Sequence, residues 1–265
     1  MSNSEMLARE LPKLRRYARA LSGTQASGDA YIGATLEALV EDPNALGKDL
    51  EPRAALFRAF TRIWQSIDLN STPEPGTVAA ADRHLGNITP LPRQAFLLTA
   101  LEGFPEEDTA EILGLSVKEV RALIEEFGQE LAAEIATDVL IIEDEPMIAM
   151  DLENLVTGLG HNVIGVGRTR TEAVQLAKGA NPGLILADIR LADMSSGIDA
   201  VNDLLQSFEI PVIFITAYPE QYLTGARPEP TFLVTKPFQP SMVSAVISQA
   251  LFFQRRAKAA ARPAA

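Results

Sequence analysis

The second half of the chain alternates short apolar runs with helical segments, and this alternation limits the possible folds more than any other feature. Five mostly apolar runs occupy residues 139–142, 162–166, 184–187, 212–215 and 232–234. Segments with helical periodicity separate them. Buried strands that alternate with helices form a parallel sheet covered on both faces. We therefore predict a doubly wound, five-stranded parallel α/β domain over residues 137–265.

Polar side chains follow four of these runs, at the point where each predicted strand ends. Glu143 and Asp144 follow the first run, Asp188 the third, Thr216 the fourth and Lys236 the fifth. Because parallel strands end at the same edge of a sheet, we expect these groups to converge. Neighbouring carboxylates repel each other, and a divalent cation with oxygen ligands relieves that repulsion. The pattern predicts a metal and reaction site at this edge.

The first half, residues 1–136, is predicted to be an all-α domain. Helical periodicity covers residues 7–21, 29–39, 53–67, 91–101, 105–113 and 117–134. A stretch rich in proline, serine and glycine, at about residues 70–87, reads as a linker between two helical subregions. Residues 105–127 have the pattern of a helix-turn-helix, in which Ser116 and Glu119 form a capping box at the second helix.

Composition excludes several classes of function. The chain has no cysteine and two histidines, which excludes disulfides, thiolate catalysis and zinc sites built on cysteine. No apolar run approaches the roughly 20 residues that cross a bilayer, and the first residues lack the pattern of a signal peptide. We expect a soluble, cytoplasmic protein that does not bind membranes.

Charge argues against nucleic acid as a partner. The formal net charge is -12, and residues 1–136 hold 13 basic and 21 acidic residues. Residues 88–136, which contain the helix-turn-helix, hold three basic and ten acidic residues. A protein that reads DNA needs several lysine or arginine contacts to phosphates. A phosphorylation-gated DNA-binding regulator that uses residues 105–127 stays open as the alternative, as does an RNA-binding output, but both lack a basic patch.

Residues 138–254 resemble a two-component receiver domain. The motifs that carry the resemblance lie at residues 142–146, 186–188, 215–217 and 235–238. Their separations fit that family: 44 residues from Asp144 to Asp188, 28 to Thr216 and 20 to Lys236. One position departs from it, since Leu233 stands where many receivers carry an aromatic residue that moves on activation. The usual coupling of threonine to an aromatic switch therefore does not transfer unaltered.

The resemblance implies the roles of these residues. Asp188 would be phosphorylated, with a sensor histidine kinase as the phosphodonor. Mg²⁺ would be held by Glu143, Asp144, Asp188 and the backbone carbonyl of Arg190. Lys236 and Thr216 would act with Asp188 in the phosphoryl transfer. The only chemistry expected is the protein's own phosphorylation and dephosphorylation, so we do not expect an enzyme with an external substrate.

The first half resembles bacterial sigma factors of the extracytoplasmic-function type. Residues 14–21 and 52–68 resemble the core-binding region, and residues 91–131 resemble the region that reads the promoter −35 element. A sigma-like domain followed by a receiver resembles the PhyR-type general stress response regulators of alphaproteobacteria. The resemblance implies partner switching: phosphorylation of Asp188 frees the sigma-like domain to sequester a small anti-sigma factor of the NepR type. The sigma factor is thereby released, and no direct binding to promoter DNA is expected.

Overall fold

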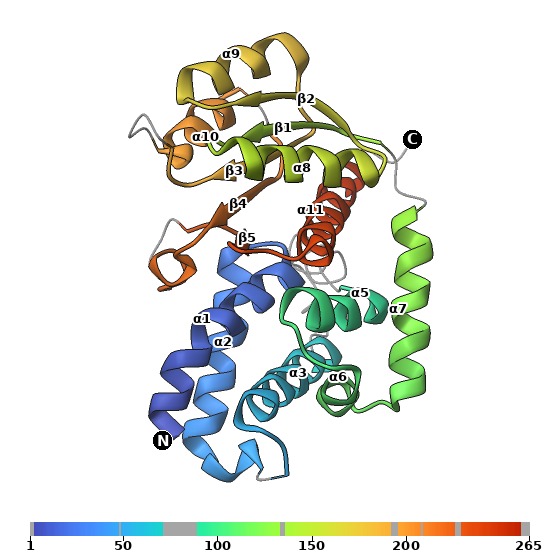
Figure 1. The fold of residues 1–265 in the computed structure, drawn as a ribbon. Helices are drawn as coiled ribbons and strands as arrows, with labels where there is room; N and C mark the ends of the chain where they lie inside the picture. Colours follow the sequence, from blue (N-terminus) through green and yellow to red (C-terminus); the bar gives the residue numbers. More distant parts are fainter. Residues whose placement is uncertain are drawn as a thin grey trace. The chain divides into compact units, whose positions relative to one another are not determined.

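The computed structural model describes residues 3–47, 49–70, 89–132, 136–191, 196–207, 209–225 and 229–260. The chain forms two compact units, shown in Figure 1. The helical unit comprises Met1–Gln129 and Leu223–Glu229, and the α/β unit comprises Glu130–Tyr222 and Pro230–Ala265. The predicted linker falls almost wholly outside the described residues.

Every described element of the helical unit up to residue 132 is a helix, as the sequence predicts. Its elements are α1 (Asn3–Ser22), α2 (Gln25–Glu41), the short 3-10 helix η1 (Pro43–Leu46), α3 (Pro52–Asn70), α5 (Leu91–Phe96), η2 (Leu97–Leu101), α6 (Glu106–Leu113) and α7 (Val117–Ala132). The predicted helix over residues 91–101 is α-helical to Phe96 and then widens into a π-helical turn, η2. Buried aromatic side chains join α1 and α3: the ring of Tyr17 lies 5.4 Å from that of Phe57 and 5.8 Å from that of Phe60, centroid to centroid.

A buried ionic cluster joins α1, α3 and the end of η2. Arg16 donates two hydrogen bonds to the carboxylate of Glu102, at 3.0 and 2.9 Å. Arg53 donates to the backbone carbonyl of Glu102 at 2.7 Å and lies 3.2 Å from its carboxylate. The side chain of Glu102 is wholly buried. Glu102 is one of the ten acids counted in residues 88–136, but it adds no negative charge to the surface, because it is buried and paired with arginines.

A short segment from the second half of the chain packs within the helical unit. Arg15 donates a hydrogen bond of 3.1 Å to the carbonyl of Leu223. The fully buried guanidinium of Arg19 lies 3.0 Å from Asp29 and 2.6 Å from Glu229. The segment that follows the fourth strand thus contributes a carboxylate to the helical core, which hydrophobic periodicity could not predict.

The α/β unit contains the predicted five-stranded parallel sheet, with strand order β2-β1-β3-β4-β5. The strands are β1 (Asp138–Ile142), β2 (Asn162–Gly167), β3 (Leu184–Asp188), β4 (Val212–Thr216) and β5 (Phe232–Thr235). The helices are α8 (Pro146–Gly158), α9 (Arg170–Ala180), α10 (Gly197–Leu205) and α11 (Pro240–Ala260). Among the residues described between β4 and β5, the only helical turn is the 3-10 turn η3 (Pro219–Gln221).

Helices cover both faces of this sheet (Figure 1). On one face, small side chains of α9 and α10, including Ala173, Ala177 and Ala200, pack on alternate strand residues such as Leu140 and Ile185. The helices α8 and α11 contact the strands as well, α8 along β1 and β2 and α11 along β4 and β5. No helix among the described residues is both long enough and apolar enough to cross a membrane.

Candidate functional site

The carboxyl ends of four strands bring the predicted site residues together. Asp188 is the last residue of β3 and Thr216 the last of β4, and both are buried. Glu143 directly follows β1 and is buried, and Asp144 beside it is half-buried. Lys236 directly follows β5. The arrangement arises because β1, β3, β4 and β5 are parallel neighbours, so their ends meet at one edge.

Lys236 is the electrostatic centre of the site. Its ammonium lies 2.7 Å from an oxygen of Asp188 and 2.9 Å from one of Glu143. A third carboxylate, that of the exposed Glu145, lies 3.6 Å away. The backbone N–H of Lys236 donates to the carbonyl of Thr216 at 2.8 Å, and the Lys236–Pro237 peptide bond is cis. The single ammonium of Lys236 therefore forms ion pairs with three carboxylates.

Burial and neighbouring charges shift the pKa values of Glu143 and Lys236. Burial raises the pKa of Glu143 to about 7; the hydrogen bond from Lys236 opposes this rise, and the charge of Asp188 adds to it. Burial acts to lower the pKa of Lys236, but its hydrogen bonds to Asp188 and Glu143 hold that pKa above the ordinary lysine value. The site as described carries more negative charge than Lys236 neutralises.

The donor set suits a hard divalent cation. One carboxylate oxygen from each of Glu143, Asp144 and Asp188 can be chosen so that all three lie within 4.8 Å of one another. Mg²⁺ prefers such oxygen ligands and usually keeps several waters. The residues present therefore fit the ion that the sequence predicts. Arg190 also lies beside the site, since its backbone N–H donates to Asp188 Oδ1 at 3.2 Å.

The structure shows where the position that departs from the usual receiver pattern lies relative to Thr216 and its loop. Leu233 is buried within β5, paired in register with Phe214 of β4. The Thr216 hydroxyl accepts a hydrogen bond of 3.2 Å from the backbone N–H of Tyr218, so its position is tied to the loop that follows β4. We predict that a change at Thr216 reaches the rest of the chain through this loop, because Leu233 supplies no aromatic ring.

Gly197 is a residue of the site that the sequence interpretation missed. A β-carbon at this position would lie 1.7 Å from the carbonyl oxygen of Asp188. We expect Gly197→Ala to push the start of α10 away from β3, with a loss of about 1–3 kcal/mol in the free energy of unfolding. Phosphate incorporation from a small phosphodonor should slow as well. Circular dichroism melting and the rate of labelling measure the two effects.

Gly179→Ala in α9 is the matched control. A β-carbon there meets no atom within 4 Å, and the residue lies inside a helix. This variant should be as stable as the parent or slightly more stable, because alanine favours helix more than glycine does. Equal melting and labelling of the two variants would contradict the close contact at Asp188.

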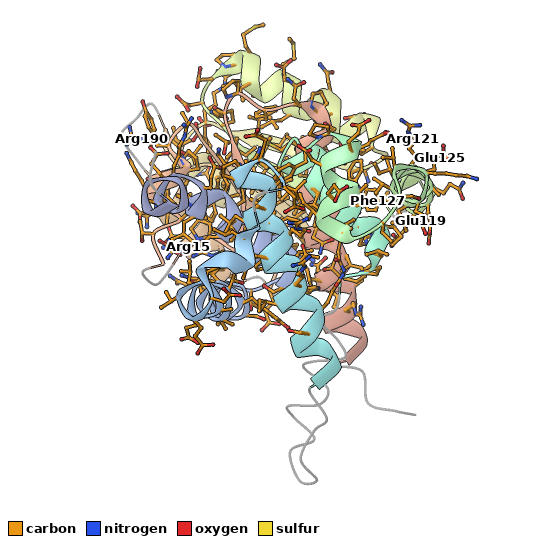
Figure 2. The ribbon with its side chains drawn as sticks, turned by 90° about the horizontal axis from the view of Figure 1, so that it is seen from below. Arg15, Glu119, Arg121, Glu125, Phe127 and Arg190 are labelled. Atoms are coloured by element: carbon orange, nitrogen blue, oxygen red, sulfur yellow. The ribbon has the colours of Figure 1, made fainter. Side chains whose placement is uncertain are left out.

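The α6–α7 hairpin has the predicted helix-turn-helix form. Gly114 ends α6 in a left-handed conformation, with φ of 70°. The backbone N–H of Ser116 donates to Glu119 at 2.8 Å, and that of Glu119 donates to the Ser116 hydroxyl at 3.3 Å, which confirms the predicted capping box. Figure 2 looks along α7: Phe127 points toward the neighbouring helix, whereas Glu119 and Glu125 point away from it.

The surface of this hairpin is unsuited to DNA. Of the three basic residues in 88–136, Arg93 lies in α5 and is buried, with its guanidinium 5.1 Å from the ring centroid of Phe127. Arg121 is exposed but paired with Glu106, and Lys118 is exposed. The acids that are exposed or half-buried are Glu106, Glu107, Asp108, Glu111, Glu119, Glu125, Glu126 and Glu130. The eight accessible acids outnumber the two accessible cations, so this surface repels a phosphate backbone.

Comparison with known proteins agrees with this division of the chain. A family model described as the Sigma2 domain of PhyR matches residues 7–61, and one described as the sigma-like domain of the response regulator PhyR matches residues 85–134. A response regulator receiver model matches residues 139–248. The Phyllosphere-induced regulator PhyR of Methylorubrum extorquens is 64% identical over 260 residues, which are 97% of each chain. The chain belongs to the PhyR family.

Solved structures of PhyR proteins share the fold. The anti-anti-sigma factor PhyR from Bartonella quintana is 50% identical, with a TM-score of 0.88 over 98% of this chain and 100% of that one. The response regulator PhyR from Brucella abortus is 49% identical, with a TM-score of 0.88 over 99% of each chain. The predicted architecture, a sigma-like helical domain followed by a receiver, is confirmed.

Proposed function

We propose that this chain is a response regulator that acts as an anti-anti-sigma factor once Asp188 is phosphorylated. The observation that carries the proposal is the sheltered carboxylate of Asp188, 2.7 Å from the ammonium of Lys236 and beside two further carboxylates. The phosphodonor is a sensor histidine kinase, and the partner of the helical unit is a NepR-type anti-sigma factor. Such partner switching takes place in the cytoplasm.

Asp188, Lys236 and Thr216 have different roles in the proposed phosphoryl transfer. A carboxylate oxygen of Asp188 attacks the phosphorus of the donor, and the donor's bond to phosphorus breaks. Lys236 holds the attacking carboxylate in place and presents a positive charge to the incoming phosphoryl oxygens. The Thr216 hydroxyl, at the end of the neighbouring strand, would donate a hydrogen bond to one of those oxygens.

Mg²⁺ would be held by Glu143, Asp144, Asp188 and the backbone carbonyl of Arg190. When bound, it supplies positive charge that offsets the negative charge gathered on the carboxylates and the phosphoryl group. Glu143, whose pKa is raised to about 7, is stabilised in its charged form by such a cation. These assignments rest on the donor set and on the match to receiver domains.

The sequence position of the segment Leu223–Glu229 supports coupling between phosphorylation and the helical unit. This segment contributes Glu229 to the buried Arg19 of α1. It lies along the chain between Thr216 and Lys236, the two residues proposed to contact the phosphoryl group. A phosphoryl group that shifts the loop after Thr216 therefore acts directly on a piece of the helical core.

The acidic surface of the helical unit supports a protein partner in place of DNA. Accessible acids outnumber accessible cations on the α6–α7 hairpin, which favours a basic partner and disfavours a promoter. The PhyR protein of Bartonella quintana, a relative of this chain, is an anti-anti-sigma factor that has been crystallised with NepR. DNA binding by residues 105–127 is the less favoured candidate.

Calorimetry with purified Bartonella quintana NepR tests the proposal. We expect the full chain to bind NepR at least about tenfold more tightly with Mg²⁺ and beryllofluoride, an acyl phosphate mimic, than with Mg²⁺ alone. Asp188→Asn should remove the difference. Equal affinity under both conditions would exclude phosphorylation-gated binding. Tight, salt-sensitive binding of promoter DNA in a gel shift would favour the DNA-binding alternative.

A further inference from the structure

The buried guanidinium of Arg19 contacts two carboxylates from distant parts of the chain. Its Nε and Nη2 atoms donate to the carboxylate of Asp29, in α2, at 3.0 to 3.2 Å. The same Nη2 donates to Glu229, in the segment Leu223–Glu229, at 2.6 Å. The side chain of Arg19 is wholly buried, whereas that of Asp29 is 20% exposed and that of Glu229 is 7% exposed. Two carboxylates therefore share one guanidinium that is shielded from water.

The carboxylate of Glu229 also holds the segment Leu223–Glu229 in its shape. It accepts hydrogen bonds from the backbone N–H of Thr224 at 2.7 Å and from that of Gly225 at 3.1 and 3.2 Å. Burial acts to raise the pKa of Glu229, but the hydrogen bonds from Thr224 and Arg19 hold that pKa below the ordinary glutamate value. Glu229 is thus charged, and it joins the fold of the segment to its contact with α1.

The contact of Arg19 with α2 does not involve this segment. A β-carbon at Gly28 of α2 would lie 2.8 Å from Arg19 Cγ, so the two helices meet at the stem of the arginine. Asp29, the next residue along α2, reaches the head of the same side chain. If the segment leaves, the guanidinium stays against Asp29, on a helix that packs on α1 by itself.

The presence of Asp29 changes the free energy of withdrawing Glu229. A buried cation is strongly destabilised when its carboxylate partner is removed. Here the departure of Glu229 removes one carboxylate of two, and the pair of Arg19 with Asp29 is kept. Two carboxylates that bond to one nitrogen atom also repel each other, and that repulsion ends when Glu229 leaves. Asp29 therefore makes the withdrawal of the segment less unfavourable.

We propose that Asp29 is a counter-ion that keeps Arg19 paired when the segment Leu223–Glu229 leaves α1 and α2, and so sets how readily phosphorylation frees the helical unit. The proposal rests on the proposed function, in which a phosphoryl group at Asp188 shifts the loop that leads into this segment. Glu229 stabilises the seated state, in which it bonds to Arg19, and Asp29 favours the withdrawn state, in which the segment has left. Asp29 is a positioning residue, because it acts through Arg19.

Calorimetry of the full chain with Bartonella quintana NepR, in Mg²⁺ alone, tests the opposite roles of the two carboxylates. Asp29→Asn should bind NepR at least about fivefold more weakly than the parent, because withdrawal then takes the second of these carboxylates from a buried cation. Glu229→Gln should bind at least about fivefold more tightly, because only the seated state loses an ion pair. A purely structural role would weaken binding in both variants.

The double variant separates an effect through Arg19 from direct contact between Asp29 and NepR. When Glu229→Gln is already present, Asp29→Asn should change the affinity less than about twofold, because neither state then contains the ion pair with Glu229. Glu37→Gln is the matched control: it removes an exposed carboxylate from the same helix and should bind NepR as the parent does. An equal loss of affinity from Asp29→Asn in both backgrounds, or the same loss in Glu37→Gln, would overturn the proposal.

Hydrogen exchange provides a measurement that does not need NepR. The backbone N–H groups of Thr224 and Gly225 are bonded to Glu229, so their exchange with solvent follows the departure of that carboxylate. Asp29→Asn should slow the exchange of these two amides at least about fivefold, whereas Glu37→Gln should leave it unchanged. Exchange in Asp29→Asn that is unchanged or faster would overturn the role of Asp29.

The outcomes distinguish this proposal from the proposed function. A parent chain that binds NepR equally with and without beryllofluoride would contradict phosphorylation-gated binding itself. Gated binding by the parent, together with an affinity of Asp29→Asn equal to that of Glu37→Gln, would contradict the role of Asp29 alone.

Discussion

The Asp188→Asn variant is expected to take up no phosphate from acetyl phosphate or from a histidine kinase, whereas the parent chain becomes labelled. Asparagine has nearly the shape of aspartate, and its amide oxygen can still accept a hydrogen bond from Lys236. The amide lacks the nucleophilic carboxylate that an acyl phosphate requires. Electrophoresis that separates phosphorylated from unphosphorylated protein, together with mass spectrometry of the labelled peptide, measures the difference.

Asp199→Asn provides the control for this experiment. Asp199 lies in the first turn of α10 and is exposed, so its replacement removes one negative charge from the surface of the same unit. This variant should be labelled at the parental rate. Label that persists in Asp188→Asn at the parental level would show that another residue accepts the phosphate, and Glu143 and Asp144 would then be examined.

The α/β unit was predictable because its strands are buried on both faces. A strand covered on both sides consists almost entirely of apolar residues, so it stands out from the helical segments beside it. All five predicted strands agree with the observed ones to within one residue at each end. The location of the site was predictable from the parallel topology of the sheet. Its residues each end or directly follow a strand: Glu143, Asp188, Thr216 and Lys236.

Helix boundaries were less predictable because they depend on local caps. The predicted helix over residues 29–39 is α2, which begins four residues earlier at Gln25. Thr24 sets this start: its hydroxyl accepts a hydrogen bond of 3.1 Å from the N–H of Ser27. The capping box at Ser116 was found because it precedes a clear apolar periodicity, whereas α2 shows only weak periodicity.

Contacts between residues far apart in the sequence could not be predicted from pattern. Gly197 is required by the approach of α10 to the carbonyl of Asp188, and nothing in its neighbours along the chain indicates that approach. Glu229 belongs to the helical unit although it lies between two strands of the sheet. A count of charges along the sequence does not reveal that Glu102 is buried, because burial is a property of the fold.

Glu102→Ala is expected to cause the largest loss of stability among changes in the helical unit. The change removes the carboxylate that Arg16 contacts at 2.9 Å and Arg53 at 3.2 Å. The guanidinium of Arg16 stays buried without this carboxylate, whereas Arg53 keeps its ion pair with Glu10 at 3.3 Å. Removing one partner of a buried ion pair costs about 3–5 kcal/mol. Urea unfolding followed by the fluorescence of Trp64 measures the effect.

Trp64 makes this measurement specific to the helical unit. It is the single tryptophan of the chain, it lies in α3, and it is buried. Its emission therefore reports unfolding of the helical unit separately from that of the α/β unit, which contains none. Glu106→Ala is the control, since the pair of Glu106 with Arg121 is exposed and is expected to contribute less than about 1 kcal/mol.

A second variant separates loss of charge pairing from loss of packing. Changing Arg16 to methionine together with Glu102 to leucine removes both charges and keeps apolar volume in their place. A protein in which apolar residues replace a buried ion pair is often as stable as its parent. The double variant should therefore unfold at a higher urea concentration than Glu102→Ala. An unfolding midpoint of Glu102→Ala equal to that of Glu106→Ala would mean that the cluster is accessible to water. The carboxylate of Glu102 would then count among the surface charges of residues 88–136.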